Sequence, residues 1–371
     1  MSAKTIIYEP QELSEQATIV VQSLQQGKLV VLPTETVYGI AAAIDNPDAI
    51  RRLSELKNRE AARPFSLVVN SEEAAQAISV HWPGLAQRLC RRICPGPITF
   101  VLEANPDAFA AYPKEAFSSC VLNGTVGVRI PDHPLTLEVL RQLGKPFLLT
   151  SANHHGQPEA ITGQQAIDNL AADVDLICDG GAAQYGEPST VVKVKESSIQ
   201  ILREGVLSAA DLKRLSSRLI VFVCTGNTCR SPMAGVLFSQ NLAKRIGCPS
   251  EDLMEHGWRI ETRGIAAFPG TRASNNAIIA MKKKKLDLTG HRSRNITSEL
   301  VREADSIFAL TQGHLYNLLK AFPEARGKTC VLHPEGIDIP DPYGGSLEIY
   351  ETCARQIENA VLLRINQMDV E

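Results

Sequence analysis

Short apolar runs alternate with amphipathic segments along most of the chain. Four aliphatic residues in a row at 29–32 are typical of a buried strand, and 46–56 has the spacing of a helix. The same alternation returns at 66–69 and 71–78. Further short strands are predicted at 98–102, 127–130 and 146–149. Because strands that alternate with helices form stacked layers, the pattern predicts an α/β fold.

A second strand–helix series begins near the middle of the chain. The apolar run 219–223 predicts a strand, and a loop with an amphipathic helix at 233–246 follows it at once. The stretch before this strand, 208–217, is short, polar and helix-like. The strand–loop–helix order is typical of a parallel sheet. We therefore predict two domains, 1–210 and 218–371, joined by a linker at 211–217.

Composition and charge exclude several classes of protein. The 371 residues are 44% hydrophobic, which is enough to bury a core in each of two domains. The formal net charge of −3 gives the whole chain no drive toward nucleic acid or an anionic membrane. No apolar run is long enough to cross a bilayer, and the first ten residues lack the core of a signal peptide. We expect a cytoplasmic protein without membrane contact.

Nine cysteines occur, which in a chain of this length does not indicate a disulfide scaffold. None of them forms a Cys-x-x-Cys pair, so we expect no structural metal site. Cys90 and Cys94 lie in a helix-like stretch and are interpreted as buried core thiols.

A cysteine and an arginine frame the loop that follows the strand at 219–223. Five residues separate Cys224 from Arg230, which stands at the entrance of the next helix. The backbone N–H groups of such a loop can form an anion nest, and the helix N-terminus adds its positive end. Pro232 suits a first helical turn, where no N–H is needed. These features favour a Cys224 thiolate that faces a bound phosphate, and Asp341, on a Pro- and Gly-rich loop, is a candidate general acid.

The stretch 219–371 resembles the low-molecular-weight protein phosphatases. The resemblance implies that Cys224 is the nucleophile, Arg230 binds the phosphate and Asp341 is the general acid. The remaining residues of the implied phosphate loop are Thr225, Gly226, Asn227, Thr228, Cys229 and Ser231. Within it Asn227 would order the loop and Ser231 would favour the thiolate. The implied fold is a four-stranded parallel sheet flanked by helices, without a cofactor. Arg263 departs from the family pattern, which usually has a small residue there.

Thr228 bears on the substrate of this domain. Family members that act on phosphotyrosine usually have an aliphatic residue at this position, whereas threonine resembles the branch that acts on protein phosphoarginine. We therefore expect a phosphoarginine phosphatase acting on a phosphorylated protein, with phosphotyrosine as the alternative. The segment 297–312 lacks the cysteines that arsenate reductases of this fold need. Cys229 is either a partner for a reversible disulfide with Cys224 or a small loop residue.

The N-terminal half carries polar motifs near the predicted strands. A hydroxyl-rich loop at 33–39 ends in a glycine that permits close backbone approach. Thr125 and Arg129 share one face of a strand, because they are four positions apart and side chains alternate between the two faces. Cations stand at Lys57, Arg59 and Arg63, and a polar loop at 150–153 ends another strand. Each motif alone is ordinary, so a functional site requires that they converge in space.

Together these motifs resemble the threonylcarbamoyl-AMP synthases over about residues 10–207. That resemblance implies synthesis of threonylcarbamoyl adenylate from L-threonine, bicarbonate and ATP, on the basic concave face of a twisted, open α/β sheet. The implied ATP-binding residues are Lys57, Arg59, Arg63, Ser151, Asn153 and Arg203. The implied threonine-binding residues are Thr34, Thr125, Arg129 and Ser189. Mg²⁺ is expected because cations must offset the charge on the triphosphate.

The product of that reaction would serve the threonylcarbamoyl modification of tRNA. The tRNA threonylcarbamoyl-transferase machinery is therefore a candidate partner, and direct tRNA contact is left open. His155 and Arg63 depart from the residues usual in the family. The alternative is a noncatalytic RNA-binding module that uses the same basic cavity, and ATP-dependent release of pyrophosphate distinguishes the two.

Overall fold

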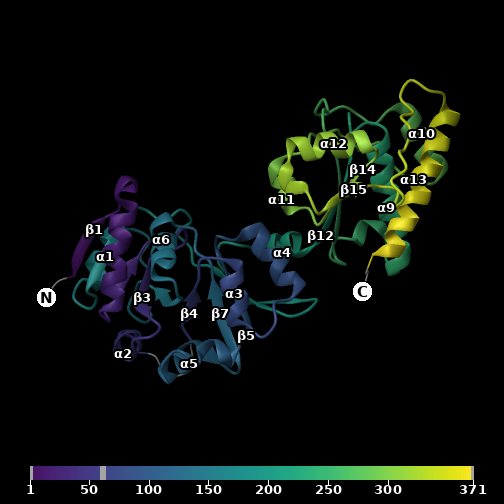
Figure 1. Ribbon diagram of the computed structural model, residues 1–371. Helices are drawn as coiled ribbons and strands as arrows, with labels where there is room; N and C mark the ends of the chain where they lie inside the picture. Colours follow the sequence, from purple (N-terminus) through teal and green to yellow (C-terminus); the bar gives the residue numbers. More distant parts are fainter. Residues whose placement is uncertain (1–2, 59–63, 369–371) are drawn as a thin grey trace. The chain divides into compact units, whose positions relative to one another are not determined.

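The computed structural model describes residues 3–58 and 64–368. The chain divides into two compact units, Met1–Leu212 and Lys213–Glu371. Helix α8 (Ala209–Ser216) occupies most of the segment predicted as a linker, in agreement with its polar, helix-like pattern. Each unit has its own sheet and its own hydrophobic core (Figure 1).

The N-terminal unit is built on a mixed sheet with the strand order β1-β9-β2-β3-β8-β4-β7-β5-β10-β11, and β6 pairs with β7. Its strands are β1 (Lys4–Ile7), β2 (Val30–Leu32), β3 (Gly39–Ala43), β4 (Ser66–Val68), β5 (Ile98–Glu103), β6 (Val121–Leu122), β7 (Thr125–Arg129), β8 (Phe147–Ser151), β9 (Leu176–Asp179), β10 (Thr190–Val194) and β11 (Ile199–Arg203). Its helices before α8 are α1 (Leu13–Gln25), α2 (Pro47–Leu56), α3 (Glu72–Ile78), α4 (Gly84–Ile93), α5 (Lys114–Cys120), α6 (Pro134–Leu143) and α7 (Gly163–Leu170). The open, mixed α/β sheet confirms the predicted fold class.

Helices α1 and α6 pack against each other and against the sheet. Val20 and Leu24 of α1 and Leu135 and Val139 of α6 are completely buried, with β2 and β3 beneath them. The spacing of four residues between each pair places both side chains on one helix face. This apolar layer anchors one side of the sheet.

The C-terminal unit has a parallel sheet with the order β13-β12-β14-β15. Its strands are β12 (Arg218–Cys224), β13 (Trp258–Gly264), β14 (Ser306–Ala309) and β15 (Thr329–Val331). Its helices are α9 (Arg230–Ile246), α10 (Asn275–Lys283), α11 (Ser298–Glu303), α12 (Gln312–Ala321) and α13 (Leu347–Gln367). Figure 1 shows α9 and α13 on one face of this sheet and α11 and α12 on the other, which confirms the predicted four-stranded parallel sheet flanked by helices.

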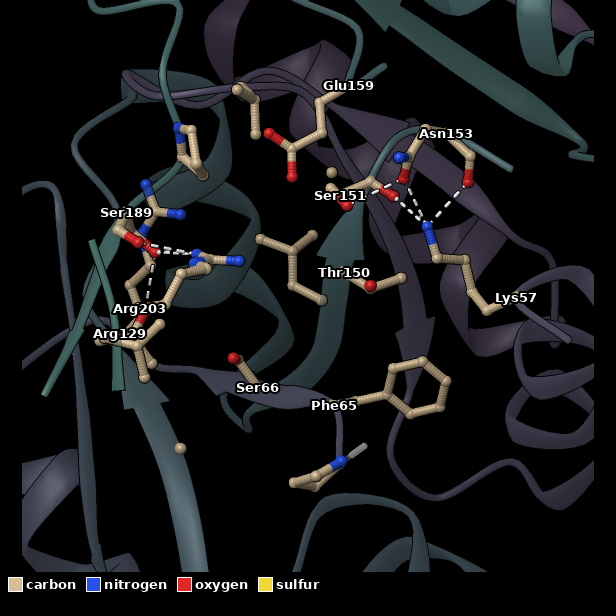
Figure 2. A pocket seen from close by; sticks show the side chains of 18 of the residues that line it. Lys57, Phe65, Ser66, Arg129, Thr150, Ser151, Asn153, Glu159, Ser189 and Arg203 are labelled. Carbon is tan, nitrogen blue, oxygen red and sulfur yellow. Dashed lines mark hydrogen bonds between the residues drawn. The ribbon is translucent and has the colours of Figure 1, made fainter. Parts of the chain in front are cut away.

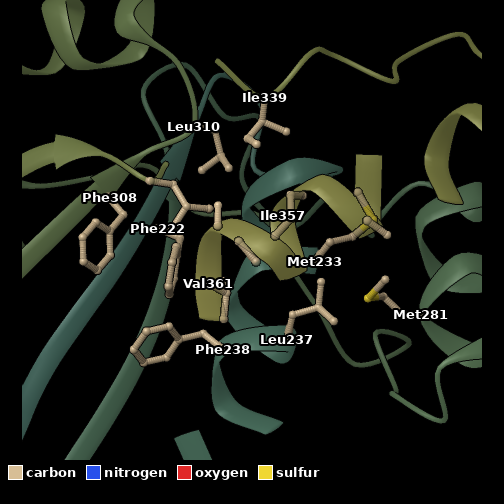
Figure 3. Packing of buried hydrophobic residues seen from close by; sticks show 14 of the residues in the cluster. Phe222, Met233, Leu237, Phe238, Met281, Phe308, Leu310, Ile339, Ile357 and Val361 are labelled. Carbon is tan, nitrogen blue, oxygen red and sulfur yellow. The ribbon is translucent and has the colours of Figure 1, made fainter. Parts of the chain in front are cut away.

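Strand β12 contributes side chains to two hydrophobic clusters, one on each face of the sheet. Leu219, Val221 and Val223 join the cluster that includes residues of α11 and α12, whereas Ile220 and Phe222 face α9 and α13. Alternation along a strand sends successive side chains to opposite faces, and a parallel sheet is covered on both. Figure 3 shows the second cluster, in which Phe222 packs beside Phe238 with ring centroids 5.2 Å apart. The first residue after this apolar strand core is Cys224, which is thereby held at the carboxyl edge of the sheet.

The described residues include no helix that is both long and apolar enough to cross a membrane. Over the same residues, no three His, Cys, Asp or Glu side chains gather where they could hold a metal ion. All nine cysteines lack a disulfide partner. Cys90 is buried, as predicted for a core thiol, and Cys94 is half-buried.

Candidate active sites

Cys224 is the last residue of β12 and begins the turn of chain that leads to α9. Only 3% of this residue is exposed, and its Sγ lies 3.0 Å from the hydroxyl oxygen of Ser231. The backbone N–H of Asn227 also points at this sulfur, with an N–S distance of 3.3 Å. Both neighbours can donate a hydrogen bond to this sulfur. The loop therefore provides a nucleophile together with inward-facing donors.

Asn227 holds this loop in shape. Its backbone φ of 55° lies in the left-handed region, which asparagine tolerates better than most residues. Its amide nitrogen donates to the hydroxyls of Ser231 and Thr262 at 2.9 and 3.0 Å. Its amide oxygen accepts from the backbone N–H of Arg294 at 2.9 Å. A buried side chain with all of these partners makes the loop rigid before any ligand binds.

Arg230 and Asp341 meet although 111 positions separate them in the chain. The Nη2 of Arg230 lies 2.5 Å from Oδ2 of Asp341, and Nη1 donates to the carbonyl of Ile339 at 3.2 Å. The guanidinium side chain is 7% exposed, whereas the carboxylate is 51% exposed. A phosphate in the loop would compete with Asp341 for the same N–H fork. The structure therefore brings the two predicted residues into direct contact.

Sequence reasoning missed a histidine beside the loop. His314, at the start of α12, lies 2.9 Å by Nε2 from the hydroxyl of Thr225, and Nδ1 lies 2.9 Å from the hydroxyl of Thr311. Burial lowers the pKa of His314 to about 4, and the nearby charge of Arg230 acts in the same direction. The imidazole is therefore neutral near pH 7 and fixes the Thr225 side chain. Nothing near 314 in the sequence signals this contact.

Tyr350 and Ser274 cover the back of the loop and were also missed. The thiol of Cys229 donates to the hydroxyl of Ser274 at 3.4 Å and lies 3.4 Å from the hydroxyl of Tyr350. Burial raises the pKa of Tyr350 to about 12. The backbone carbonyl of Thr228 accepts from the N–H of Ser274 at 2.9 Å. The side-chain hydroxyl of Thr228 lies 3.6 Å from the Cys229 sulfur. Thr228 and Cys229, whose roles the sequence leaves open, therefore belong to one hydrogen-bonded cluster with Ser274 and Tyr350.

The N-terminal unit contains a cavity of about 1360 Å³ on its sheet. Gly127 pairs with Ser66 on one side and with Val101 on the other, and all three line the cavity. Cross-strand partners point to the same face, so the cavity floor is one face of the sheet. Residues of the predicted site that line it are Lys57, Thr125, Arg129, Ser151, Asn153, Ser189 and Arg203, and His155 lies there too. Arg59 and Arg63 lie outside the described residues.

Lys57 follows helix α2 and is buried, with 5% of the residue exposed. Its ammonium donates to the carbonyl of Ser151 at 3.1 Å and to the carbonyl and side-chain oxygens of Asn153 at 2.7 and 2.5 Å. The hydroxyl of Ser151 donates to the same Asn153 oxygen at 2.9 Å. Figure 2 shows the lysine pointing at this polar loop. Lys57 therefore shapes the loop after β8 besides adding positive charge to the cavity wall.

Arg203 lies near a second guanidinium in the same cavity. Its Nη2 donates to the carbonyl oxygen of Ser189 at 2.7 Å and to the hydroxyl of Ser189 at 3.2 Å (Figure 2). Burial lowers the pKa of Arg203 from its ordinary value, and the charge of Arg129 acts in the same direction although Glu159 opposes it. An anion bound between the two guanidinium groups would reduce the repulsion between their positive charges.

Arg129 is held by a carboxylate that sequence reasoning missed. Its Nη2 donates to Oε1 of Glu35 and to the hydroxyl of Thr36, each at 2.7 Å. The side chains of Glu35 and Arg129 are 1% and 8% exposed, and Glu35 also accepts from the N–H of Asp132 at 2.8 Å. Because both charges are buried, each depends on the other. Glu35 lies in the hydroxyl-rich loop noted at 33–39, but the sequence could not predict that this carboxylate pairs with Arg129.

Thr34, predicted to bind threonine, is not among the residues that line the cavity. It is 2% exposed, and its hydroxyl donates to the carbonyl of Val37 at 2.6 Å and lies 3.0 Å from the hydroxyl of Thr36. Its side chain therefore closes the turn that carries Glu35. The loop was predicted as part of the site, but the structure gives this particular residue an internal role.

The geometry defines two classes of protein in one chain. The N-terminal unit is an α/β domain with a cation-lined cavity, and residues 22–205 match the family model described as telomere recombination. The C-terminal unit has a cysteine–arginine phosphate loop, and residues 219–369 match the family model of low molecular weight phosphotyrosine protein phosphatase.

Individual relatives are consistent with this division. A threonylcarbamoyl-AMP synthase of Vibrio campbellii is 32% identical over 189 residues, which are 50% of this chain and 97% of that protein. One of Pyrococcus abyssi is 31% identical over 216 residues, 57% of this chain, and the chain covers 61% of its length. The solved structure of a YwlE mutant from Bacillus subtilis is 33% identical and covers 41% of this chain and 98% of its own, with a TM-score of 0.37. The chain belongs to the threonylcarbamoyl-AMP synthase family through its N-terminal domain, and its C-terminal domain is a low-molecular-weight phosphatase domain.

Proposed function

We propose that the chain is a bifunctional enzyme of the cytoplasm. Its N-terminal domain makes L-threonylcarbamoyl adenylate from L-threonine, bicarbonate and ATP for the modification of tRNA. Its C-terminal domain removes phosphate from phosphoarginine in proteins through a cysteinyl-phosphate intermediate. The tRNA threonylcarbamoyl-transferase machinery would take up the adenylate, which makes it the natural partner of the first domain.

The observation that supports the synthase activity is the meeting of Lys57, Arg129 and Arg203 at one cavity. In the proposed reaction the carbamate of threonine attacks the α-phosphorus of ATP, and pyrophosphate leaves. Negative charge grows on the phosphates during this step, and fixed cations offset it in a site that is already organised. We propose that Arg203 and the loop shaped by Lys57 bind the nucleotide, whereas Thr125, Arg129 and Ser189 face the threonine.

Mg²⁺ would accompany ATP in this cavity. Magnesium usually binds one or two carboxylates together with the phosphates of the substrate, and it keeps several waters. Glu159 is the one carboxylate among the described residues that line the cavity, and Figure 2 shows it at the wall near Ser151. The donor set therefore fits an ion that arrives on the triphosphate, where it would neutralise charge on the leaving pyrophosphate.

Pyrophosphate release tests the first half of the proposal. The full chain receives ATP with and without L-threonine and bicarbonate, and release should require both. Arg59→Ala should lower the rate roughly ten- to hundredfold, because a charge-assisted contact contributes about 1.5–3 kcal/mol. If the wild-type chain binds RNA but releases no pyrophosphate, the noncatalytic RNA-binding alternative replaces the enzyme.

The observation that supports the phosphatase activity is the Cys224 sulfur at the centre of a loop of donors, with Arg230 and Asp341 beside it. We propose that the thiolate attacks phosphorus, while Arg230 holds two phosphate oxygens and Asp341 protonates the departing group. Water then hydrolyses the cysteinyl phosphate, with the Asp341 carboxylate as the base. No metal or cofactor takes part in this proposal.

We favour phosphoarginine over phosphotyrosine because of the hydroxyl at Thr228. Phosphoarginine has N–H donors just beyond the phosphorus, and a hydroxyl can accept from one of them. An aliphatic side chain would leave that donor unpaired, at a cost of about 1–3 kcal/mol. Rates on peptides that carry each phosphorylated residue test this preference. A clear preference for phosphotyrosine peptides would establish the alternative.

We further propose that Cys229 protects the nucleophile. Mild peroxide would oxidise the Cys224 thiolate, and attack by the Cys229 thiol would then form a reversible disulfide and release water. Mass spectrometry of the oxidised protein should show this disulfide, and a thiol reductant should restore activity. Irreversible inactivation without a disulfide would assign Cys229 to the structure of the loop alone.

A further inference from the structure

Two loop segments beside the phosphate loop form one rigid platform. These are 265–274, after β13, and 289–295, before α11, and we call them together the basic platform. The backbone N–H of Gly270 donates to Ser293, and the backbone N–H of Ser293 donates to the carbonyl of Thr271, each at 2.9 Å. The two segments therefore pair with each other along their length.

The platform is also bonded directly to the phosphate loop. The N–H of Ser274 donates to the carbonyl of Thr228 at 2.9 Å, and the N–H of Arg294 donates to the side chain of Asn227 at 2.9 Å. His291 contacts the carbonyl of Asn227 by Nε2 at 2.7 Å. The basic platform is therefore a direct neighbour of the phosphate loop.

The exposed charges of the platform are all positive. Arg272, Arg292 and Arg294 are exposed, and neither segment contains an acidic residue. Within the described part of the chain, the side chains of Arg272 and Arg294 have no hydrogen bond or ion pair. Arg292 contacts only backbone carbonyls, those of Thr289 and His291, at 3.2 and 2.7 Å. These three guanidinium groups thus lack the carboxylate partner that Arg230, Arg259 and Arg263 have.

Neighbouring arginines show the contrast. On β13, Arg259 lies 2.6 Å from Glu303 and Arg263 lies 2.7 Å from Glu261. The acidic residue nearest to the platform in sequence, Asp287, is bonded to the N–H and hydroxyl of Thr289 at 2.8 and 3.0 Å. Burial lowers the pKa of His291, the hydrogen bond to Asn227 opposes this shift, and the charges of Arg292 and Arg294 add to it.

We propose that the basic platform binds an acidic segment of the protein substrate that flanks the phosphorylated residue. This inference rests on the phosphatase activity proposed above and specifies its substrate. Uncompensated cations on a rigid surface attract carboxylates and steer their approach, and the ionic strength governs both effects. Because the platform is held by the phosphate loop itself, the docked segment would lie in register with the nucleophile.

The test compares two phosphopeptides that differ only in whether three flanking residues are Glu or Gln. The wild-type chain should have a kcat/KM about three- to tenfold higher for the Glu peptide at low salt, and 0.5 M NaCl should remove most of the difference, because exposed charges interact weakly and are screened. Arg272→Gln with Arg292→Gln should abolish the preference. A control pair on the same domain, Lys320→Gln with Arg326→Gln, makes the same change of charge and should leave the preference intact.

Hydrolysis of p-nitrophenyl phosphate separates the two proposals, because this probe has no flanking segment. If the wild-type chain hydrolyses neither this probe nor a phosphopeptide, the phosphatase proposal fails, and fluorescence anisotropy with the Glu and Gln peptides still measures docking. Equal kcat/KM and equal binding for the two peptides would overturn the platform proposal. The proposal would also be overturned if a labelled RNA bound the chain through Arg272 and Arg292 while the Glu and Gln peptides showed equal kcat/KM and equal binding.

Discussion

The two sites of this chain are assembled in opposite ways. In the phosphatase domain, the proposed nucleophile Cys224, the proposed phosphate-binding residue Arg230 and the loop-ordering Asn227 all lie within eight consecutive positions, 224–231, between one strand and one helix. The cavity of the N-terminal domain collects its cations at Lys57, Arg129 and Arg203, from the end of a helix and from two strands. One site is local in the chain, and the other depends on the register of a sheet.

This difference has consequences for how each site fails. In the phosphatase site, hydrogen bonds from Asn227 to Ser231 and Thr262 hold the loop, and Cys224 itself carries no buried ion pair among the described residues, so its replacement should leave the fold intact. In the dispersed site, the cavity residue Arg129 is paired with Glu35 in the protein interior, so structure and activity are coupled there. We therefore expect Cys224→Ser to act mainly on rate and Glu35→Gln to act mainly on folding.

The largest effect is expected for Cys224→Ser. A hydroxyl stays protonated where a thiol ionises, so phosphatase turnover should fall by roughly 10⁴-fold or more, the scale seen when a covalent nucleophile is removed. Release of p-nitrophenol measures the loss, and pyrophosphate release by the other domain should be unchanged. Cys330→Ser, a thiol away from the loop, serves as the control. Full turnover in Cys224→Ser would refute the cysteinyl-phosphate mechanism.

Glu35→Gln should destabilise the N-terminal domain by about 3–5 kcal/mol, because it leaves the buried guanidinium of Arg129 without its partner. Hydrogen exchange followed by mass spectrometry resolves this domain from the other one. Asp48→Asn breaks an exposed pair with Arg51 and should have little effect on stability, because solvent screens the two charges. Equal effects of the two variants would show that Glu35 does not organise the cavity.

Lys57→Met tests the loop after β8. It removes the donors to Ser151 and Asn153, and we expect roughly a hundredfold loss in threonine-dependent pyrophosphate release, the upper range for a charged hydrogen-bonding group. The exposed Lys114→Met is the control. If Lys57→Met keeps its kcat but has a raised KM for ATP, Lys57 contributes to the binding of ATP and not to the chemical step.

A pH effect of roughly 2 kcal/mol is expected from His314, whose pKa falls from an ordinary 6.5 to about 4 on folding. A lowered pKa means that the folded state disfavours the proton. The contribution to stability is therefore complete above pH 6.5 and is lost as the pH falls toward 4. Urea unfolding of the C-terminal domain at pH 7 and pH 5 measures it. His314→Gln should remove this part of the pH dependence, whereas exposed His256→Gln should not; the same slope in both would contradict the assignment.

The smallest effect concerns substrate choice. Thr228→Ile should lower kcat/KM for phosphoarginine peptides about tenfold, because one N–H donor loses its acceptor, and should spare or raise the value for phosphotyrosine peptides. Thr225→Val, which removes the other nearby hydroxyl, is the matched control. An unchanged ratio of the two substrates in Thr228→Ile would mean that this side chain only shapes the loop.

The sequence by itself determined the local site and the fold class. Cys224, Asn227 and Arg230 act within one strand–loop–helix unit, and the geometry of such a unit follows from short-range backbone rules, so their spacing was enough to indicate a phosphate loop. The alternation of strands and helices indicated two α/β domains for the same reason. The motifs of the N-terminal half together indicated a resemblance to a family, but the sequence could not show where they lie relative to one another in space.

Only the tertiary structure decided which side chains meet across long distances in the chain. It brought Glu35 to Arg129, and it gave Thr34 an internal role although its neighbours serve the cavity. It also placed His314 against Thr225 and brought three unpaired arginines to the edge of the phosphate loop. Such contacts depend on strand register and loop packing, which join positions that no short motif relates, because burial and charge pairing are properties of the assembled core.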